Sequence, residues 1–349
     1  MSQKIVIIII SSFLAATILL LIFIKLFLFK TKEHDIVEEK KQVFSGKIDL
    51  KTAYIFDKDR NVKANDVMQS QKNISFDKDD NVKIYFSNKL INPHTIKYFK
   101  YLQNLFKINT GLTNHLDEVQ KYLFTQWQQN EASELYKIYK SYIQSELNLM
   151  EAMKTWGTPS NPESLLEFLA KAQAFRRSSL GEELADALFG AEIKAQEYSI
   201  RRGMIINDKD AYGEEKEQKL KALDQDMWGD EAEVVDNYPD QYTQYREKLE
   251  IYKKNLDEAS SEDDRNTKIK KFREDFFSPE VIKKLEDIDR KLTGEKQVED
   301  KYYLEERKIL EDTKLSPAEK QHKKNELQNK FFGDEAEAFR RRENIKNQR

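Results

Sequence analysis

The sequence has 349 residues, of which 35% are charged, while glycine occupies only 10 positions and proline 6. So few turn-forming residues argue against a sandwich, a barrel or a doubly wound sheet, and the abundance of Glu, Lys, Gln and Leu favours helices. Four of the 59 basic residues precede residue 33, so from there onward 55 basic residues face 62 acidic ones, a balance of −7. This acidic body excludes nucleic acid as the expected partner, since phosphate contacts need a basic surface.

The first predicted element is a membrane-spanning helix at residues 5–24. These twenty residues carry no charge, and at about 1.5 Å per residue such a helix matches a hydrocarbon core about 30 Å thick. The alternative is a cleaved signal peptide, which usually has a shorter apolar stretch and a small-residue cleavage site. Here the chain runs on into Lys25 and Lys30 through further apolar residues. We therefore expect an uncleaved anchor followed by a linker at residues 25–45, with an orientation that charge alone leaves open.

After the linker comes the only stretch with strand character, and it contains a short internal repeat. Residues 56–63 (FDKDRNVK) recur as residues 76–83 (FDKDDNVK). Each copy pairs an apolar run with an Asp- and Asn-rich turn, which predicts two hairpin turns. The alternating acidic side chains also resemble the start of a calcium loop, but the glycine position of that loop holds Val62 or Val82. The turn interpretation is therefore favoured over a metal site.

In the rest of the chain, apolar residues recur at intervals of three and four, which predicts helices that each bury one face. Residues 98–106 and 135–143 are clear examples of this spacing. Two prolines with small polar neighbours mark a break at residues 157–162. Ser160 or Asn161 is the expected N-cap of the helix that follows.

Four short motifs pair bulky apolar residues with Gly or Ser-Pro and then with acidic residues, at residues 188–192, 227–233, 276–280 and 331–337. Their steps of 39, 49 and 55 residues are too irregular for a fixed-period solenoid. In each motif the breaker would end one helix, and the acidic side chains would begin the next at its positive N-terminus. We predict four helix-to-helix corners. Their aromatic residues either fill a local core or contact a partner protein, and they are Phe189, Trp228, Phe277 and Phe332.

Residue types that usually carry catalysis are sparse. The chain has no cysteine and four histidines, none of which forms a zinc-type pair. It also lacks a phosphate-binding glycine loop and a Gly-x-Ser-x-Gly motif. Carboxylates are abundant, but on helices this charged they are expected to be solvated or to form i,i+4 pairs. The sequence predicts a protein that is not an enzyme, has no cofactor, metal or small-molecule substrate, and acts by binding another protein.

Several segments follow one another in an order that resembles a known family. They are Phe276 to Asp289, Glu306 to Leu310, Leu315 to Lys320, Phe332 to Glu335 and Arg340 to Glu343, with Leu188 to Gly190 and Leu220 to Asp224 upstream. The likeness extends loosely from Gly46 to the end of the chain. The chain thus resembles the membrane-anchored lipase chaperones, or lipase-specific foldases, of Gram-negative bacteria.

The hallmark of that family is an Arg-x-x-Phe-Asp-Tyr motif in its first small helical domain. The register of the preceding segment places the motif on Ile96, Phe99, Lys100, Tyr101 and Leu102. Phe99 and Tyr101 fit the pattern, and their alternative role is ordinary helix packing. The arginine position holds Ile96 and the aspartate position holds Lys100. Any network built around that arginine and aspartate is therefore altered in this chain.

The resemblance implies an all-α fold, an extended multi-helix array in which an extended helical segment joins two small helical domains. We place the first domain, with the strand-like segment, at residues 46–157, the extended segment at 158–275 and the second domain at 276–349. The resemblance also implies an anchor in the bacterial inner membrane, residues 1–4 in the cytoplasm and the body in the periplasm. The implied partner is a secreted triacylglycerol lipase that the chain helps to fold. The alternative is a membrane-tethered helical scaffold or adaptor of the cell envelope without foldase activity.

Overall fold

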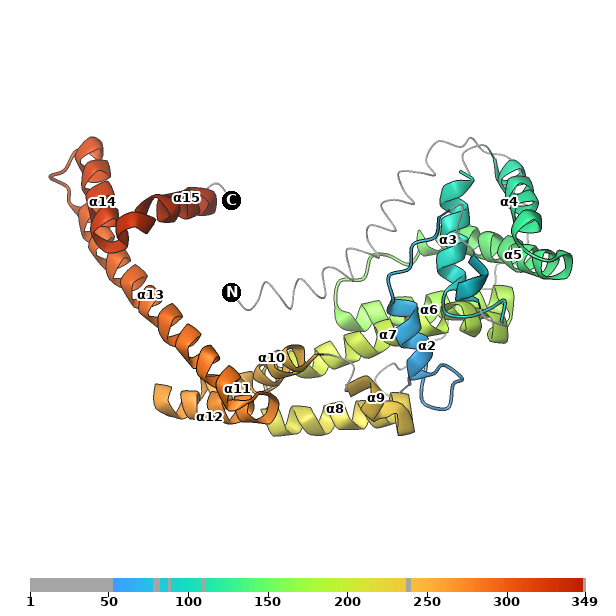
Figure 1. Ribbon diagram of the computed structural model, residues 1–349, viewed down its shortest axis with the longest axis horizontal. Coiled ribbons are helices and arrows are strands. Elements are labelled where there is room, and N and C mark those ends of the chain that lie inside the picture. Colours follow the sequence, from blue (N-terminus) through green and yellow to red (C-terminus); the bar gives the residue numbers. More distant parts are fainter. Residues whose placement is uncertain (1–52, 78–81, 87–88, 108–110, 237–239, 348–349) are drawn as a thin grey trace. The chain divides into compact units, whose positions relative to one another are not determined.

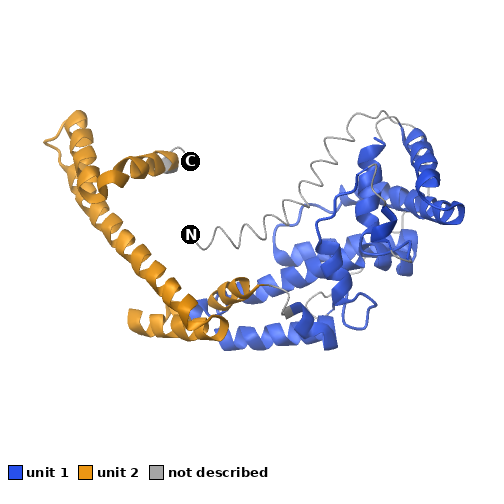
Figure 2. Cartoon of the chain, viewed as in Figure 1, with its two compact units in different colours: residues 1–239, 250–254 blue, residues 240–249, 255–349 orange. Residues whose placement is uncertain are grey.

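The computed structural model describes residues 53–77, 82–86, 89–107, 111–236 and 240–347 (Figure 1). Within these ranges the chain forms α-helices and short 3-10 turns and contains no strand, so the predicted all-α class is confirmed. Contacts along the chain define two compact units, coloured separately in Figure 2. They are unit 1, Met1–Pro239 with Glu250–Lys254, and unit 2, Asp240–Leu249 with Asn255–Arg349.

The predicted membrane anchor at residues 5–24 and the linker at 25–45 lie outside the described residues. Among the residues that are described, no helix is both long enough and apolar enough to cross a bilayer.

The segment with predicted strand character is described in part, and that part contains helix α2 (Ala64–Gln71) and the 3-10 turn η1 (Val82–Tyr85) in place of strands. In the first copy of the repeat, the Asp57 carboxylate accepts the backbone N–H groups of Asp59 and Arg60 at 3.1 Å each. This local turn leads directly into α2, so no return strand of a hairpin follows it.

Unit 1 is built around helix α7 (Glu182–Ile206), against which α2 and α6 pack. The capping prediction at residue 161 is confirmed, because the Asn161 side chain accepts the N–H of Ser164 at 2.7 Å. Aromatic side chains dominate the core, with Phe99, for example, lying edge-on to Tyr139. The other elements of unit 1 are α3 (Thr95–Leu105), α4 (Leu112–Gln126), α5 (Gln129–Met153), α6 (Pro162–Leu180), α8 (Gly213–Trp228), η3 (Gly229–Glu231) and α9 (Ala232–Asp236).

Unit 2 is organised by one long helix, α13 (Pro279–Glu311). One cluster at its start brings Tyr245 against Phe277, and another at its end surrounds the buried Tyr302 with Phe331, Phe332 and Phe339. Helix α13 is therefore fixed at both ends (Figure 1). The other elements are α12 (Glu262–Phe276), α14 (Pro317–Phe332), η4 (Gly333–Glu335) and α15 (Ala336–Asn347), together with α10 (Gln241–Ile251) and α11 (Lys253–Asp257), which both span the boundary between the units.

Three of the four predicted corners are confirmed. Helices end at Trp228, Phe276 and Phe332, and a new turn or helix begins within three residues of each. The corner predicted at residues 188–192 is wrong, because these residues lie inside α7. Gly190 allows the Val62 side chain to pack against the backbone of α7, because a Cβ atom at position 190 would lie only 2.8 Å from Cγ2 of Val62.

The two units share a helical hairpin whose second copy follows the first by 104 residues. Helix α8 runs from Gly213 to Trp228 and α14 from Pro317 to Phe332, so both ends differ by 104 (317 minus 213 and 332 minus 228). Each helix ends at a glycine of positive φ, Gly229 with φ 55° and Gly333 with φ 50°, and each then enters a Gly-Asp-Glu 3-10 turn.

Contacts inside the two hairpins correspond as well. Lys216 Nζ donates to the Ile206 carbonyl at 2.8 Å, and Lys320 Nζ donates to the Leu310 carbonyl at 2.6 Å, again 104 residues later. Tyr198 lies 5.4 Å from Trp228 between ring centroids, and their equivalents Tyr302 and Phe332 are 5.2 Å apart. The hairpin formed by α7 and α8 is thus repeated in α13 and α14.

Candidate functional site

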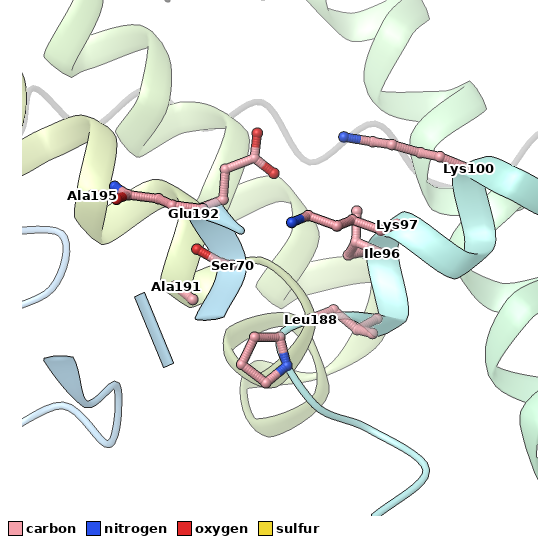
Figure 3. A pocket seen from close by; sticks show the side chains of 10 residues that line it. Ser70, Ile96, Lys97, Lys100, Leu188, Ala191, Glu192 and Ala195 are labelled. Atoms are coloured by element: carbon pink, nitrogen blue, oxygen red, sulfur yellow. The ribbon is translucent and has the colours of Figure 1, made fainter. Parts of the chain in front are cut away.

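A groove of about 170 Å³ lies in unit 1 between α2, α3 and α7. Helix α3 contributes Ile96, Lys97 and Lys100, and α7 contributes Leu188 and Glu192. The floor of the groove is apolar, while charged side chains form its rim (Figure 3). Two of the five predicted motif residues, those at the altered arginine and aspartate positions, therefore line the same depression.

The other three motif residues, Phe99, Tyr101 and Leu102, do not line the groove. Phe99 and Leu102 are fully buried, and Phe99 packs against both Tyr139 and Tyr142. Tyr101 is half-buried, and its ring stacks on Tyr98 at 6.1 Å between centroids. Burial raises the pKa of the Tyr101 hydroxyl. Of the predicted motif, Lys100 is the residue that a bound protein can reach without disturbing the packing of α3.

The rim of the groove carries both signs of charge. In Figure 3, Lys97 and Lys100 extend from α3 toward the carboxylate of Glu192 on α7. Burial lowers the pKa of Lys97, and the nearby Glu192 carboxylate opposes this effect. Lys97 also donates a hydrogen bond to the backbone carbonyl of Lys72. Glu192 on α7 thus places an acidic group on the side of the groove opposite Lys97 and Lys100.

Beside the groove, residues 53–63 cross the face of α7, and we call this segment the strap. Glu197 of α7, fully buried, accepts the backbone N–H groups of Ile55 and Phe56 at 3.0 Å. Lys194 donates to the Val62 carbonyl at 2.9 Å. These buried charges are satisfied largely by backbone groups, so they hold the strap in one register.

The strap and the first residue of α2 also hold the corner between α8 and α9. The N–H of Lys58 donates to the Asp226 carbonyl at 2.9 Å, and the N–H of Ala64 donates to Glu231 at 2.8 Å. Lys194 lies over the Trp228 ring, with Nζ 4.4 Å from its centroid, and burial lowers the pKa of this lysine to about 8. Trp228 is thereby part of the interior of unit 1.

The four corner aromatics have two different environments. Phe189 and Trp228 are buried in unit 1, with 4% of their surface exposed, whereas Phe277 and Phe332 in unit 2 are half-buried. Phe277 and Phe332 are therefore more accessible to a partner protein than Phe189 and Trp228.

Several residues of interest carried no motif in the sequence. Lys97 and Glu192 on the groove rim are two charged residues among many, and no local spacing distinguishes them. The hairpin repeat had a usable signal, since residues 227–233 (MWGDEAE) and 331–337 (FFGDEAE) are 104 positions apart. The two matching motifs are the second and the fourth of the four corner motifs, so the 104-residue period is absent from the steps between successive motifs.

Comparison with known proteins identifies the family. A family model described as proteobacterial lipase chaperone protein matches residues 138–337, which include most of α5 and reach the start of α15. The matched range begins after the hallmark motif, so the placement of that motif on residues 96–102 still rests on the resemblance in the sequence. A search of curated proteins found no match. More than half of the chain fits the family model, and the chain belongs to the proteobacterial lipase chaperone family.

Proposed function

We propose that this protein binds a secreted triacylglycerol lipase and assists its folding to the active state, without being an enzyme itself. The observation that carries the proposal is the family match over residues 138–337, which includes parts of both helical units. Membership of the lipase chaperone family suggests assistance to lipase folding.

The physical basis is selective binding. A ligand that binds one state of a folding protein more tightly than the other states stabilises that state. The gain in free energy grows with the logarithm of the ratio of the affinities. A helical surface that binds the transition state for folding of the lipase more tightly than its collapsed precursors lowers the barrier to the native state. Candidate contact residues are Lys100 on the groove rim, together with Phe277 and Phe332, whose rings keep partial exposure.

The proposal includes a location. Residues 5–24 form an uncharged stretch of twenty residues, the length that a spanning helix needs. We propose that they anchor the protein in the bacterial inner membrane, with the helical units in the periplasm, where a secreted client passes. The support for this location is the sequence pattern and the resemblance to anchored family members.

The direct test is a refolding assay with the full chain in detergent micelles. A lipase from the source organism is denatured, diluted into buffer with or without the chain, and assayed for ester hydrolysis. We expect activity to be recovered in the presence of the chain and to saturate near a one-to-one ratio, because binding is stoichiometric. An unrelated detergent-solubilised helical membrane protein serves as the control.

Two outcomes would contradict the proposal. Equal recovery with the chain and with the control would show that no specific assistance occurs. Capture of envelope proteins, but no lipase, after crosslinking in the source cells would favour a membrane-tethered scaffold without foldase activity.

A further inference from the structure

Two of the four histidines are buried at the two ends of helix α3. His94 immediately precedes Thr95, the first residue of α3, and 9% of its surface is exposed. His115, on α4, is 1% exposed and is hydrogen-bonded to the carbonyl of Phe106, the residue that follows the last one of α3. Helix α3 also supplies one wall of the groove, so the position of its two ends bears directly on the shape of the groove.

The hydrogen bonds of His115 require a neutral ring. Because a carbonyl oxygen only accepts, Nδ1 of His115 donates to Phe106, and the Tyr139 hydroxyl of α5 donates to Nε2 at 2.7 Å. A proton on Nε2 would oppose the hydroxyl hydrogen, and the buried Tyr139 hydroxyl has no other hydrogen-bond partner among the described residues. Protonation would thus bury both a charge and an unsatisfied hydroxyl hydrogen. Burial lowers the pKa of His115, although the Phe106 carbonyl opposes this effect.

The surroundings of His94 also favour a neutral ring. Its Nδ1 atom is buried and has no hydrogen-bond partner in the described part of the chain, so a proton on this atom would have no acceptor. The charged groups that face it are Lys97 of α3 and Lys72, which follows α2. Tyr85 of η1 lies edge-on to the ring, with 6.4 Å between the centroids. Burial and the two positive charges lower the pKa of His94.

We propose that His94 and His115 form an acid-sensitive latch on α3. While both rings are neutral, the latch holds the two ends of α3 against the rest of unit 1. When the rings take up protons, the ends of the helix detach, and the wall of the groove that carries Ile96 and Lys100 moves away from α7. The latch acts on unit 1 alone, because unit 2 contains a single histidine, His322, whose side chain is 74% exposed.

The direction of the pH effect follows from proton uptake. An exposed histidine takes up a proton at about pH 6.5, whereas both latch histidines stay neutral to lower pH while α3 is packed. Below about pH 6.5 the open form therefore binds more protons, and acid favours it. The stabilisation of the closed form is complete above that pH and is lost as the pH falls toward the lowered pKa values. Between about pH 7.5 and about pH 5.5, each histidine can raise the population of the open form by at most about tenfold.

Hydrogen exchange of the full chain in detergent micelles tests the latch, with rates corrected for the intrinsic pH dependence of exchange. We expect acidification from about pH 7.5 to about pH 5.5 to raise the opening constant of α3 by up to about a hundredfold, about tenfold for each histidine. The opening constants of α7 in the same unit and of α14 in unit 2 should not follow this change. Acceleration spread equally over unit 1, or none in α3, would overturn the proposal.

Three single variants assign the effect to its residues. His94→Gln and His115→Gln replace a titratable ring with a neutral amide that can still donate a hydrogen bond, so each should remove about tenfold from the acid response of α3. His322→Gln, at an exposed position of α14, is the matched control and should keep the full response. A full response in both His94→Gln and His115→Gln would contradict the latch.

A measurement on the unmodified chain covers the case in which a variant folds poorly. In protein labelled with carbon-13 on its histidine rings, NMR identifies His94 and His115 by their contacts with the rings of Tyr85 and Tyr139. Both should take up protons below about pH 6.5. Proton uptake by both at or above that pH would show that the packing of α3 does not oppose their protonation, and the latch would be wrong.

Discussion

Helix α7 in unit 1 and helix α13 in unit 2 belong to the same repeated hairpin, yet the middle of α7 buries one of its faces while the middle of α13 is exposed on every side. The lengths of the second helices, α8 and α14, their terminal glycines and the lysine-to-carbonyl bonds correspond. What differs is the cover, which in unit 1 is supplied by the strap, α2 and α3. The internal contacts of the hairpin therefore define its shape, while the segments that pack against it determine which of its faces are buried.

The residues on the two helices have diverged to suit these environments. Lys194 and Glu197 of α7, which are buried and bind the backbone of the strap, correspond to Val298 and Lys301 of α13, which are exposed. A buried charge is tolerated only where partners satisfy it. Unit 1 has those partners within its own chain, and α13 carries an apolar residue and a solvated lysine instead.

The largest expected effect comes from removing the cover of α7. Phe56 is fully buried beneath Arg177 and beside Gly190, so Phe56→Ala should lower the free energy of unfolding of unit 1 by about 3–5 kcal/mol. The exposed Leu292→Ala should change stability by less than about 0.5 kcal/mol. All three tryptophans lie in unit 1, so denaturant titration followed by tryptophan fluorescence reports that unit alone, and circular dichroism reports both. Equal effects of the two substitutions would contradict the difference in cover.

A pair of glycine substitutions should change stability in opposite directions. Gly190→Ala forces a methyl group against Val62 and Phe56 and should destabilise unit 1 by about 1–3 kcal/mol. Gly294→Ala meets open space and should stabilise α13 by about 0.5–1 kcal/mol through helix propensity. Thermal unfolding by circular dichroism, with hydrogen exchange to assign each change to its helix, measures both. If Gly294→Ala destabilises the free chain, the middle of α13 is not bare.

A pH dependence should distinguish unit 1 from unit 2. The pKa of Lys194 is lowered by burial to about 8, whereas an unfolded lysine keeps its proton up to about 10.5. Between these values the unfolded state binds more protons, so stability rises with pH, by at most about 1.4 kcal/mol per pH unit. In Lys194→Met this rise should be absent. Fluorescence-detected denaturation of both proteins between these pH values measures the difference, and parallel curves would show that Lys194 does not titrate there.

The smallest expected effect on stability concerns the groove rim. Lys100 is partly exposed and lines the groove, so Lys100→Ala should change the free energy of unfolding by less than about 0.5 kcal/mol. If the groove takes part in client binding, the same variant recovers less lipase activity than the unmodified chain in the refolding assay. Lys140→Ala, at an exposed position of α5, is the control. Equal recovery by both variants would remove Lys100 from the client interface.

Much of the helical architecture was accessible from the sequence because it depends on local signals. Asn161 caps its helix as predicted, and the glycines at 229 and 333 end theirs, since each feature acts within a few residues. The failed corner at residues 188–192 had the same local pattern. There Gly190 continues the helix because Val62, far away in the sequence, packs against it. A local pattern cannot distinguish these two uses of glycine.

The candidate site was predicted less completely than the fold. The motif register pointed to α3, and Ile96 and Lys100 do line a groove, but the opposing Glu192 comes from a helix more than 90 residues later. The exposure of Val281, Ile288 and Leu292 on α13 was likewise not visible in the sequence, because their spacing is that of any buried helix face. This exposure, and the cover of α7 in unit 1, are tertiary properties.

Hydrogen exchange of the full chain in micelles tests the difference in cover between α7 and α13 most directly. Amide groups in an exposed, unsupported helix exchange through local opening. We predict faster exchange across Asp287–Val298 than across the middle of α7, whose buried face packs within unit 1. Equal exchange rates in the two segments would contradict the account.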